Sequence, residues 1–336
     1  MSQALETAPE IPTALSHDEY AQVLKGLSQA SVDRHFDAFI DVPWDSPDFE
    51  IRKDDPRWVL PAGSDPLGGH PWYQAQSLER QIEIGQWRQA NILKVGLQFE
   101  NILIRGIMQY VFTLRNGSPE YRYLTHEATE ECHHTQMFQE TVNRIGVDVP
   151  GMPWIMRRVA GLLPWAASLF PIGFFIGVLA GEEPIDHTQK AVLREGKDLP
   201  PVMSRIMEIH VAEEARHISF AHEYIKRRGP RLGPIDRFII ALLFPVIMRV
   251  LCDVIMVPSK EFRKEFNIPR KVMKDLFWRA PASRERLADM FGDVRMLAEQ
   301  SNLMTRSSRI MWKLCRIDGR SSRYRSEPPV ALKSAA

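Results

Sequence analysis

Cysteine is scarce in this sequence. Its three cysteines, Cys132, Cys252 and Cys315, lie far apart and form no Cys-x-x-Cys pair. This pattern argues against a disulfide framework and is typical of proteins from a reducing cytosol. The first 16 residues contain neither a basic start nor an apolar run, so no secretory signal is expected. We therefore expect a cytoplasmic protein.

An excess of charge of either sign is also absent. The 43 Lys and Arg residues nearly balance the 42 Asp and Glu residues, which leaves a formal net charge of +1. Such a balance gives no reason to expect a nucleic-acid partner. The alternation of apolar and polar residues that is typical of β-strands is missing as well. With 336 residues, of which 44% are hydrophobic, the chain can bury a sizeable core.

Helix start and stop signals predict an all-α fold. Ser77 can cap a helix that runs to about Arg115, and Ser118 with Pro119 can open a second one that ends at Gly146. Pro171 can open a third. The fourth follows "DLPP" and stops at "RRGP", where Gly229 can take a left-handed cap. Two more helices are expected over 234–266 and 283–315.

The remaining segments set the domain boundaries. Residues 1–16 are expected to be disordered, and 41–74, with six prolines, should form an extended wrap. The basic, Ser- and Pro-rich end at 316–336 should be a flexible tail. The sequence therefore predicts one helical domain over 17–315.

One apolar run complicates the picture of a soluble bundle. Val159 to Gly181 carries no charge over 23 residues, which is long enough to span a bilayer, but Pro164 and Pro171 interrupt it. A buried helix preceded by an apolar loop is one interpretation. Contact with a membrane surface or a lipid-like substrate is the other, and the apolar stretch 238–251 favours it.

The stretch "HVAEEARHISF" brings metal-binding residue types together. His210, Glu214 and His217 lie four and three residues apart, so they project from one narrow face of a helix. A Glu-x-x-His pair on a helix is what a helical bundle uses to bind iron or manganese in its core.

A second Glu-x-x-His pair lies in "EATEECHHTQMF", where two frames fit. Glu131 recurs with Leu124 and Phe138 at seven-residue intervals and therefore lies on the apolar stripe. The alternative frame, Glu130 with His133, lies further round the helix. We therefore take Glu131 and His134 as the inward pair.

Spacing supplies the remaining carboxylates. Glu100 is a lone acid in an apolar run, and a buried carboxylate needs a cation. The interval from Glu100 to Glu131 equals the interval from Glu183 to Glu214. Adding 83 maps Glu100, Glu131 and His134 onto Glu183, Glu214 and His217, as in an internal repeat. The neighbouring Glu182 has Phe99 as its counterpart, so Glu183 is the predicted ligand.

Four carboxylates and two imidazoles form a ligand set for two divalent ions. Glu131 and Glu214 would bridge the ions, Glu100 and Glu183 would be terminal ligands, and the charges would cancel. Iron is favoured because carboxylates dominate, with manganese as the alternative. His210 has no counterpart in the repeat. It is either a further ligand beside Glu183 and His217 or a neighbour that only supports the ligands.

These residues resemble the p-aminobenzoate N-oxygenase family of di-iron oxygenases, over roughly residues 44–229. The most specific mark is the additional histidine one turn before the second Glu-x-x-His. The resemblance implies a ferritin-like four-helix bundle, often dimeric, with two iron ions held by Glu100, Glu131, His134, Glu183, His210, Glu214 and His217. It also implies dioxygen activation, an electron-donating reductase or ferredoxin, and oxidation of a small organic substrate such as an aromatic amine.

Other functions fit the same residues. A ferroxidase or iron-handling protein would use the same ligands without an organic substrate. A manganese/iron or radical-forming oxidase would give Tyr224 a role, and a lipid-like substrate would suit the apolar segments. A membrane-associated helical protein would bind no metal.

Overall fold

The computed structural model describes residues 15–195 and 198–327 and contains no strand in those ranges. The all-α prediction is therefore confirmed. The α-helices are α1 (His17–Asp33), α2 (Pro71–Gln74), α3 (Leu78–Val111), α4 (Glu120–Ile145), α5 (Trp154–Val159), α6 (Ala166–Leu169), α7 (Pro171–Glu195), α8 (Pro201–Arg228), α9 (Pro234–Met256), α10 (Lys260–Glu265), α11 (Arg270–Lys274), α12 (Pro281–Met290), α13 (Gly292–Gln300) and α14 (Arg306–Leu314). Short helical turns are η1 (Pro47–Phe49), η2 (Pro56–Trp58), η3 (Leu163–Trp165), η4 (Gly229–Arg231) and η5 (Asp275–Arg279).

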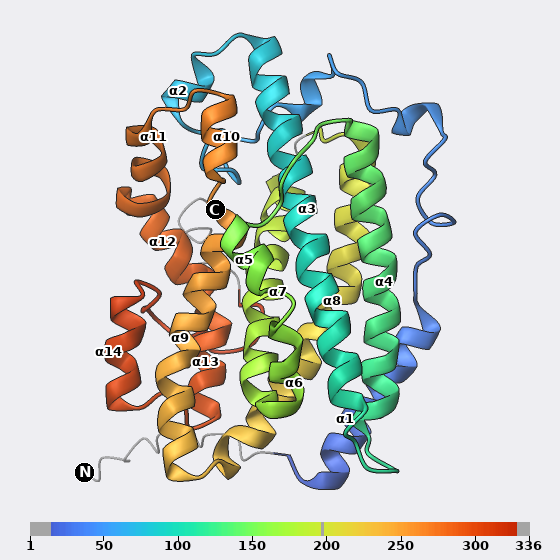
Figure 1. Ribbon diagram of the computed structural model, residues 1–336, viewed down its shortest axis with the longest axis vertical. Coiled ribbons are helices and arrows are strands. Elements are labelled where there is room, and N and C mark those ends of the chain that lie inside the picture. The colour runs from blue at the N-terminus through green and yellow to red at the C-terminus, as the bar shows by residue number, and fades with distance from the viewer. Residues whose placement is uncertain (1–14, 196–197, 328–336) are drawn as a thin grey trace, which may run out of the picture.

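Four long helices, α3, α4, α7 and α8, form the central bundle and run along the long axis of the molecule (Figure 1). Helix α3 packs on α4, α7 packs on α8, and the two pairs meet through α4 with α8 and α3 with α7. Helix α9 covers α7, and the later helices gather on that side, as Figure 1 shows. The prediction of a four-helix core with additional C-terminal helices is thus confirmed.

Local capping chemistry explains the start of α3 and the end of α4. The Ser77 side chain accepts from the backbone N–H of Arg80 and starts α3, and Gly146 ends α4 in the left-handed conformation with φ 73°. Two predictions were wrong in detail. Pro119 rather than Ser118 is the N-cap of α4, and Gly229 remains right-handed because the chain continues into η4.

The C-terminal helices are shorter than predicted. The first ends at Met256, and Ser259 caps the next one by accepting from Phe262 N–H. The stretch 283–315 is divided among α12, α13 and α14, with Thr305 capping the last. Side-chain caps such as Ser259 and Thr305 therefore start new helices where hydrophobic periodicity alone predicts one continuous helix.

The N-terminal part of the chain wraps around the bundle as expected, with η1, η2 and α2 as short helical turns along it. Gly85 lets this wrap approach α3, because a Cβ there would collide with the carbonyl oxygen of Trp58. Residues 1–14 of the predicted disordered start lie outside the described residues, whereas Ser16 forms a capping box at the start of α1.

The tail prediction is wrong for residues 316–327. Ile317 is fully buried, the Arg295 side chain donates to its carbonyl oxygen, and Ser326 N–H donates to Asp293. Residues 328–336 lie outside the described part of the chain. Thus the first half of the tail packs on the C-terminal helices because it offers apolar and backbone partners despite its basic composition.

The apolar run 159–181 does not form a single helix. It covers the end of α5, then η3, α6 and the first half of α7, and several of its large side chains are exposed. Phe175, Ile176 and Leu179 on α7 are buried, as the core interpretation requires. The segment before Pro171 lies outside the bundle, over α3 and α7.

Two apolar clusters fill the bundle above and below a polar layer. One contains Leu103, Ala128, Leu179 and Ile218, and the other contains Leu97, Met137, Val192 and Ile209. On each of the four helices the chain passes from one cluster to the other through a buried carboxylate. The fold therefore places its acidic side chains in the middle of the bundle, sealed at both ends.

Candidate metal centre

Two groups of buried acidic and imidazole side chains meet in this polar layer. The first contains Glu100, His134, His210 and Glu214, and the second contains Glu131, Glu182, Glu214 and His217. Within each group one donor atom per residue lies within 4.8 Å of the others. Six of the seven predicted side chains are therefore brought together.

Glu131 and Glu214 lie between the two groups. Glu131 directs Oε2 at His134 Nδ1, 3.1 Å away, and Oε1 at His217 Nδ1, 2.8 Å away. Glu214 directs Oε1 at His210 Nε2, 3.2 Å away, and Oε2 at His217 Nδ1, 3.5 Å away. Each carboxylate thus offers one oxygen to either side, which is what a bridging ligand requires.

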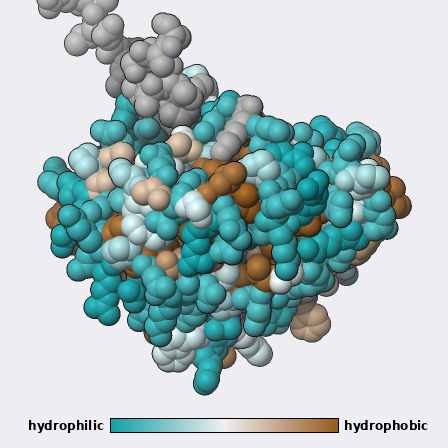
Figure 2. Space-filling view, turned by 90° about the horizontal axis from the view of Figure 1, so that it is seen from above, coloured by the Kyte–Doolittle hydropathy of each residue, from teal (hydrophilic) through white to brown (hydrophobic). Residues whose placement is uncertain are grey.

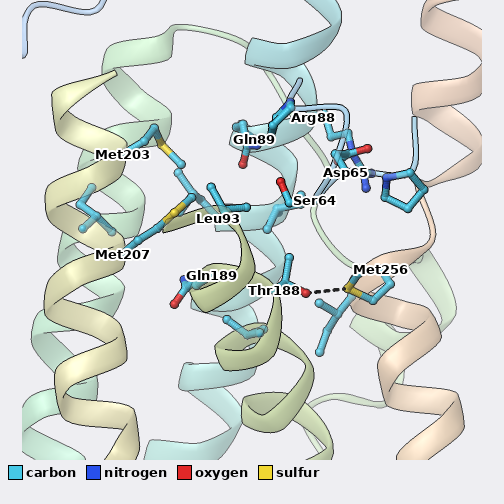
Figure 3. A pocket seen from close by; sticks show the side chains of 17 residues that line it. Ser64, Asp65, Arg88, Gln89, Leu93, Thr188, Gln189, Met203, Met207 and Met256 are labelled. Carbon is cyan, nitrogen blue, oxygen red and sulfur yellow. Dashed lines mark hydrogen bonds and ion pairs between the residues drawn. The ribbon is translucent and has the colours of Figure 1, made fainter. Parts of the chain in front are cut away.

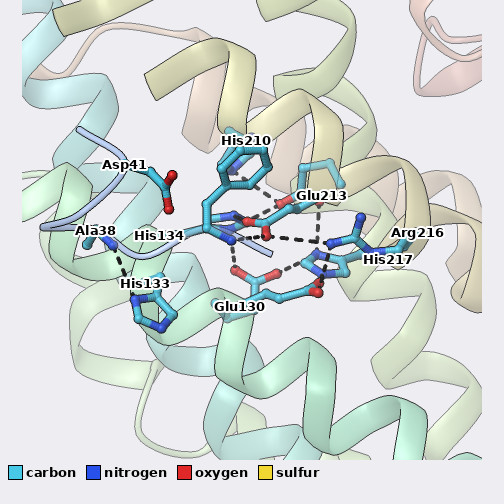
Figure 4. Close-up of polar contacts among 12 residues, drawn as sticks. Ala38, Asp41, Glu130, His133, His134, His210, Glu213, Arg216 and His217 are labelled. Carbon is cyan, nitrogen blue, oxygen red and sulfur yellow. Dashed lines mark hydrogen bonds and ion pairs between the residues drawn. The ribbon is translucent and has the colours of Figure 1, made fainter. Parts of the chain in front are cut away.

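Two further glutamates hold the two histidines from behind (Figure 4). His134 Nε2 lies 2.8 Å from Glu213 Oε2, and His217 Nε2 lies 2.8 Å from Glu130 Oε2. Since a carboxylate accepts, each Nε2 carries a proton. Each Nδ1 is directed at the centre and would offer its lone pair to a metal ion once it has lost its own proton. The offset that relates the two halves of the ligand set also relates Glu130 to Glu213, so the repeat extends to the carboxylates that orient the ligands.

Arg216 joins the two orienting carboxylates. Its Nη2 lies 2.7 Å from Glu130 Oε1 and 3.5 Å from Glu213 Oε1. Glu213 Oε1 also accepts from the backbone N–H of Phe36, at 3.2 Å, in the segment that follows α1. The positive guanidinium stabilises the buried negative charges of Glu130 and Glu213, which do not belong to the two metal-binding groups.

His210 belongs to the first group, not beside His217 as predicted. On α4 and α8, residue 130 meets 217 while 134 meets 213, so these two helices run antiparallel. One turn back from Glu214 therefore leads toward His134, whose ring centroid is 4.7 Å from that of His210. His210 Nδ1 donates to Gln189 Oε1 at 3.0 Å, which leaves Nε2 free toward Glu100 and Glu214.

The structure corrects Glu183 to Glu182. Glu182 faces the second group, whereas Glu183 Oε1 lies 2.8 Å from His222 Nε2 and lines a polar cavity of about 300 Å³ on another side of α7. Adjacent residues on a helix point about 100° apart, so only one of them can face the centre. Both glutamates continue an apolar stripe of α7, so the sequence pattern does not distinguish them. The offset of 83 selects the wrong one because the loop between α7 and α8 need not have the same length as the loop between α3 and α4.

Glu127 is a buried acid that the sequence interpretation missed. It lies one turn before Glu131, as His210 lies one turn before Glu214, and is fully buried. By the antiparallel arrangement it lies on the His217 side, and its charge interacts with that imidazole. Burial raises the pKa of Glu127 to about 8 despite the opposing effect of His217.

The electrostatics of the cage follow from burial and mutual contact. Burial would raise the pKa of Glu131, but His217 and His134 outweigh it and hold the pKa well below its usual value. Burial opposes protonation of His134, yet Glu131 and Glu213 raise its pKa to about 10. Burial also lowers the pKa of His210 to about 4. Without cations the cage balances its charge with protons, so metal binding would release them.

The residues present fit a pair of metal ions. Several buried donor atoms of the two groups make no well-directed hydrogen bond within the described chain and face only one another: Glu131 Oε1, both oxygens of Glu182 and of Glu214, His210 Nε2 and His217 Nδ1. Such atoms are costly in a protein interior unless a cation binds them. Oxygen and imidazole donors without thiolate suit iron or manganese.

An apolar cavity of about 450 Å³ reaches the centre from outside. Three ligand side chains, Glu100, Glu182 and His210, are its only polar lining residues within the described chain. Apolar residues of α3, α5, α6, α7 and α9 form the rest. A second cavity, of about 70 Å³, has Gln189, the partner of His210, in its lining, and none of its described lining residues belongs to either group (Figure 3).

Comparison with known proteins agrees with this centre. The family model of the P-aminobenzoate N-oxygenase AurF matches residues 17–302. The chain is 63% identical over 310 residues to the Uncharacterized protein MT0908 of Mycobacterium tuberculosis (strain CDC 1551 / Oshkosh), covering 92% of this chain and 91% of the relative. It is 62% identical over 310 residues, with the same coverage, to the Uncharacterized protein Mb0909 of Mycobacterium bovis (strain ATCC BAA-935 / AF2122/97). With this match and two buried Glu/His groups in a four-helix bundle, the chain belongs to the p-aminobenzoate N-oxygenase family of ferritin-like di-iron proteins.

Proposed function

We propose that this protein is a di-iron oxygenase that uses dioxygen to oxidise an apolar organic substrate. The observation that carries the proposal is the apolar cavity of about 450 Å³, whose polar end is made of ligands from both groups. A substrate in this cavity would lie directly against the metal-binding side chains. Two iron ions, when bound, would supply dioxygen activation, with electrons from a reductase or ferredoxin.

The protein's own residues prepare the site for such a pair. Glu131 and Glu214 would bridge, and Glu100 with His134 and Glu182 with His217 would complete the two halves. His210 adds a third nitrogen donor on the Glu100 side. Glu213 and Glu130 hold a proton on Nε2 of each imidazole, so each Nδ1 already points at the centre before metal arrives and becomes a donor when its own proton leaves.

The cavity favours an apolar substrate over an aminobenzoate. Among the described residues its lining contains no Lys or Arg that would pair with a carboxylate. An unpaired carboxylate in such surroundings would lose its hydration without compensation. N-oxygenation of a small aromatic acid therefore receives less support than oxidation of a larger, uncharged part of a molecule.

A ferroxidase that only handles iron is the competing function. Its substrate is the metal, so it would need a polar route for iron and no apolar chamber. Here the chamber that contacts Glu100, Glu182 and His210 is apolar, which favours an organic substrate.

The test is to measure bound metal and oxygen use in the same protein. Protein loaded anaerobically with Fe²⁺ should bind two irons per chain and consume dioxygen once reduced. Oxygen uptake should then depend on added electron donor, not on added iron. Binding of no metal would overturn the proposal, and sustained oxidation of added Fe²⁺ without a donor would establish the ferroxidase.

A further inference from the structure

The elements that line the apolar cavity also carry large exposed apolar side chains. These side chains come from three places: Met108 and Phe112 at the end of α3, Trp154, Ile155, Val159, Leu162, Trp165 and Leu169 along α5 to α6, and Ile235, Phe238, Ile239, Leu243 and Val250 on α9. We call this set the apolar face. Leu169 is 80% exposed and Phe112 is 86% exposed, which soluble proteins avoid in such numbers unless the surface binds something.

The apolar face and the cavity are continuous. Val159, Leu243 and Val250 belong to both, so the mouth opens between α5 on one side and α9 on the other. Further in, Phe170, Phe174 and Val178 of the cavity lining lead to Glu182. An apolar path therefore runs from the exposed surface to the ligands of the metal centre.

The charge pattern of this face indicates its partner. From 151 to 181 the chain has no acidic residue, and its two charged residues, Arg157 and Arg158, are both exposed on α5. Exposed tryptophans beside arginines and leucines are typical of segments that lie in the interface of a bilayer with anionic headgroups. By contrast, the end of the molecule seen from above is mostly hydrophilic (Figure 2).

The packing of α9 suits contact with a membrane surface better than a crossing of the bilayer. The stretch Pro234–Glu265 is long and apolar enough to span a bilayer by composition. However, Ile240, Phe244 and Met248 of α9 are fully buried in the core, and α9 packs against α7 and α14. Crossing the bilayer would remove these side chains from the core, whereas surface contact uses only the exposed side of α9.

Building on the function proposed above, we propose that the apolar face docks on a lipid bilayer and that the cavity takes a long apolar chain from it. The substrate class is thus an amphiphile with an acyl or isoprenoid chain. Its headgroup stays near Arg157 and Arg158, and its chain reaches Glu100, Glu182 and His210. This explains why the chamber is apolar up to the ligands and open on the same side as the tryptophans.

Vesicle flotation tests the docking half. Wild-type protein should float with vesicles of phosphatidylcholine and phosphatidylglycerol, and less with phosphatidylcholine alone. The double variant Trp165→Glu/Leu169→Glu should lose about tenfold or more of the bound protein. Ile40→Glu, a change at an 81% exposed residue of the N-terminal wrap, is the matched control and should float like wild type. Equal flotation of the double variant would overturn docking.

Light scattering in the same buffers separates a membrane from a second copy. If the wild-type chain is a dimer that the double variant converts to a monomer, and neither protein floats, the face joins two copies and the proposal is wrong. Both readouts are independent of bound iron. Failure of docking and failure of the oxygenase function are therefore distinguishable.

A cavity-filling variant tests the chain-binding half. A Cβ at Gly177 on α7 would meet nothing within 4 Å, and Gly177 lines the chamber, so the side chain of Gly177→Leu would start into open space there. Wild-type protein should bind parinaric acid with enhanced fluorescence, and Gly177→Leu should lose about tenfold in affinity while it keeps two metal ions and vesicle binding. Unchanged parinaric acid binding in Gly177→Leu would show that the chain does not enter this cavity.

Discussion

Oε2 of Glu130 on α4 lies 2.8 Å from Nε2 of His217 on α8, and the same relation recurs in the opposite direction between Glu213 on α8 and His134 on α4. Each helix therefore supplies a ligand and also holds the ligand of the other helix. This exchange is the most specific feature of the centre, because it fixes two imidazole tautomers at once.

Glu213→Gln and Glu130→Gln should each weaken metal binding about 10- to 100-fold while the fold is kept. An amide keeps the size of the side chain but can offer its NH₂ group to Nε2, which favours the wrong tautomer of the histidine. Competition with a chelator during Fe²⁺ or Co²⁺ titration measures the loss. Glu208→Gln, an exposed change on α8, is the control and should bind as wild type. Wild-type affinity in both test variants would remove the orienting role.

Adjacent carboxylates on α7 give a matched pair for the ligand assignment. Glu182→Ala should bind at most one metal ion per chain, because the second group loses its terminal carboxylate. Glu183→Ala should bind two ions and lose only about 1–3 kcal/mol of stability through the unpaired His222. Elemental analysis and thermal unfolding provide both numbers. The reverse result would reinstate Glu183 as the ligand.

His210→Ala should affect one ion and not the other. His210 lies with Glu100 and His134, so the ion on that side should bind about tenfold or more weakly while the His217 side retains its ion. A stepwise Co²⁺ titration followed by absorption resolves the two events. His133→Ala is the control, since His133 accepts from Ala38 N–H outside both groups (Figure 4). Equal weakening of both steps would contradict the assignment of His210 to one side.

Glu127 should make the stability of metal-free protein depend on pH. Its pKa is about 8 in the fold against an ordinary value of 4.5, so the folded state favours the protonated form. The stability that this preference contributes is present below about pH 4.5 and is lost as pH rises toward 8. Glu127→Gln removes the loss and should gain about 1–3 kcal/mol over wild type at pH 8 but little at pH 5. If the free energy of unfolding of the two proteins changed with pH in the same way across this range, Glu127 would not be buried and protonated in the fold.

Gly85→Ala should destabilise the protein by about 1–3 kcal/mol, because the new Cβ would collide with the Trp58 carbonyl and push the wrap off α3. Gly26→Ala on α1, where nothing lies within 4 Å, should instead stabilise it by about 0.5–1 kcal/mol through helix propensity. Urea unfolding of both variants checks the contrast. A neutral Gly85→Ala would mean that the wrap does not rest on α3.

Sequence patterns located the four bundle helices and most of the ligands because both depend on local rules. Caps such as Ser77 and Gly146 act within one turn, and Glu131 could be chosen over Glu130 from the apolar stripe of a single helix. Glu182 could not be chosen over Glu183 in this way, since both continue an apolar stripe and the deciding contact, His222, comes from another helix.

For His210 and Glu127 the sequence alone does not predict the position relative to the two groups, because that position depends on helix direction. Their spacing from Glu214 and Glu131 was visible in the sequence, but the side of the centre on which each lies depends on the antiparallel packing of α4 and α8. The roles of Glu130, Glu213 and Arg216 also arise only between helices, although the offset of 83 could have drawn attention to the two carboxylates.

The hydrogen bond from Phe36 to Glu213 ties the outside of the molecule to its middle. The same carboxylate also holds His134. A metal ion that immobilises this imidazole would therefore also immobilise Glu213, to which the segment that follows α1 is hydrogen-bonded. Metal binding and attachment of the segment around Phe36 would then be thermodynamically linked, and each would strengthen the other. Loss of metal would then weaken the attachment of this segment, so its mobility would report on metal occupancy from the surface of the molecule.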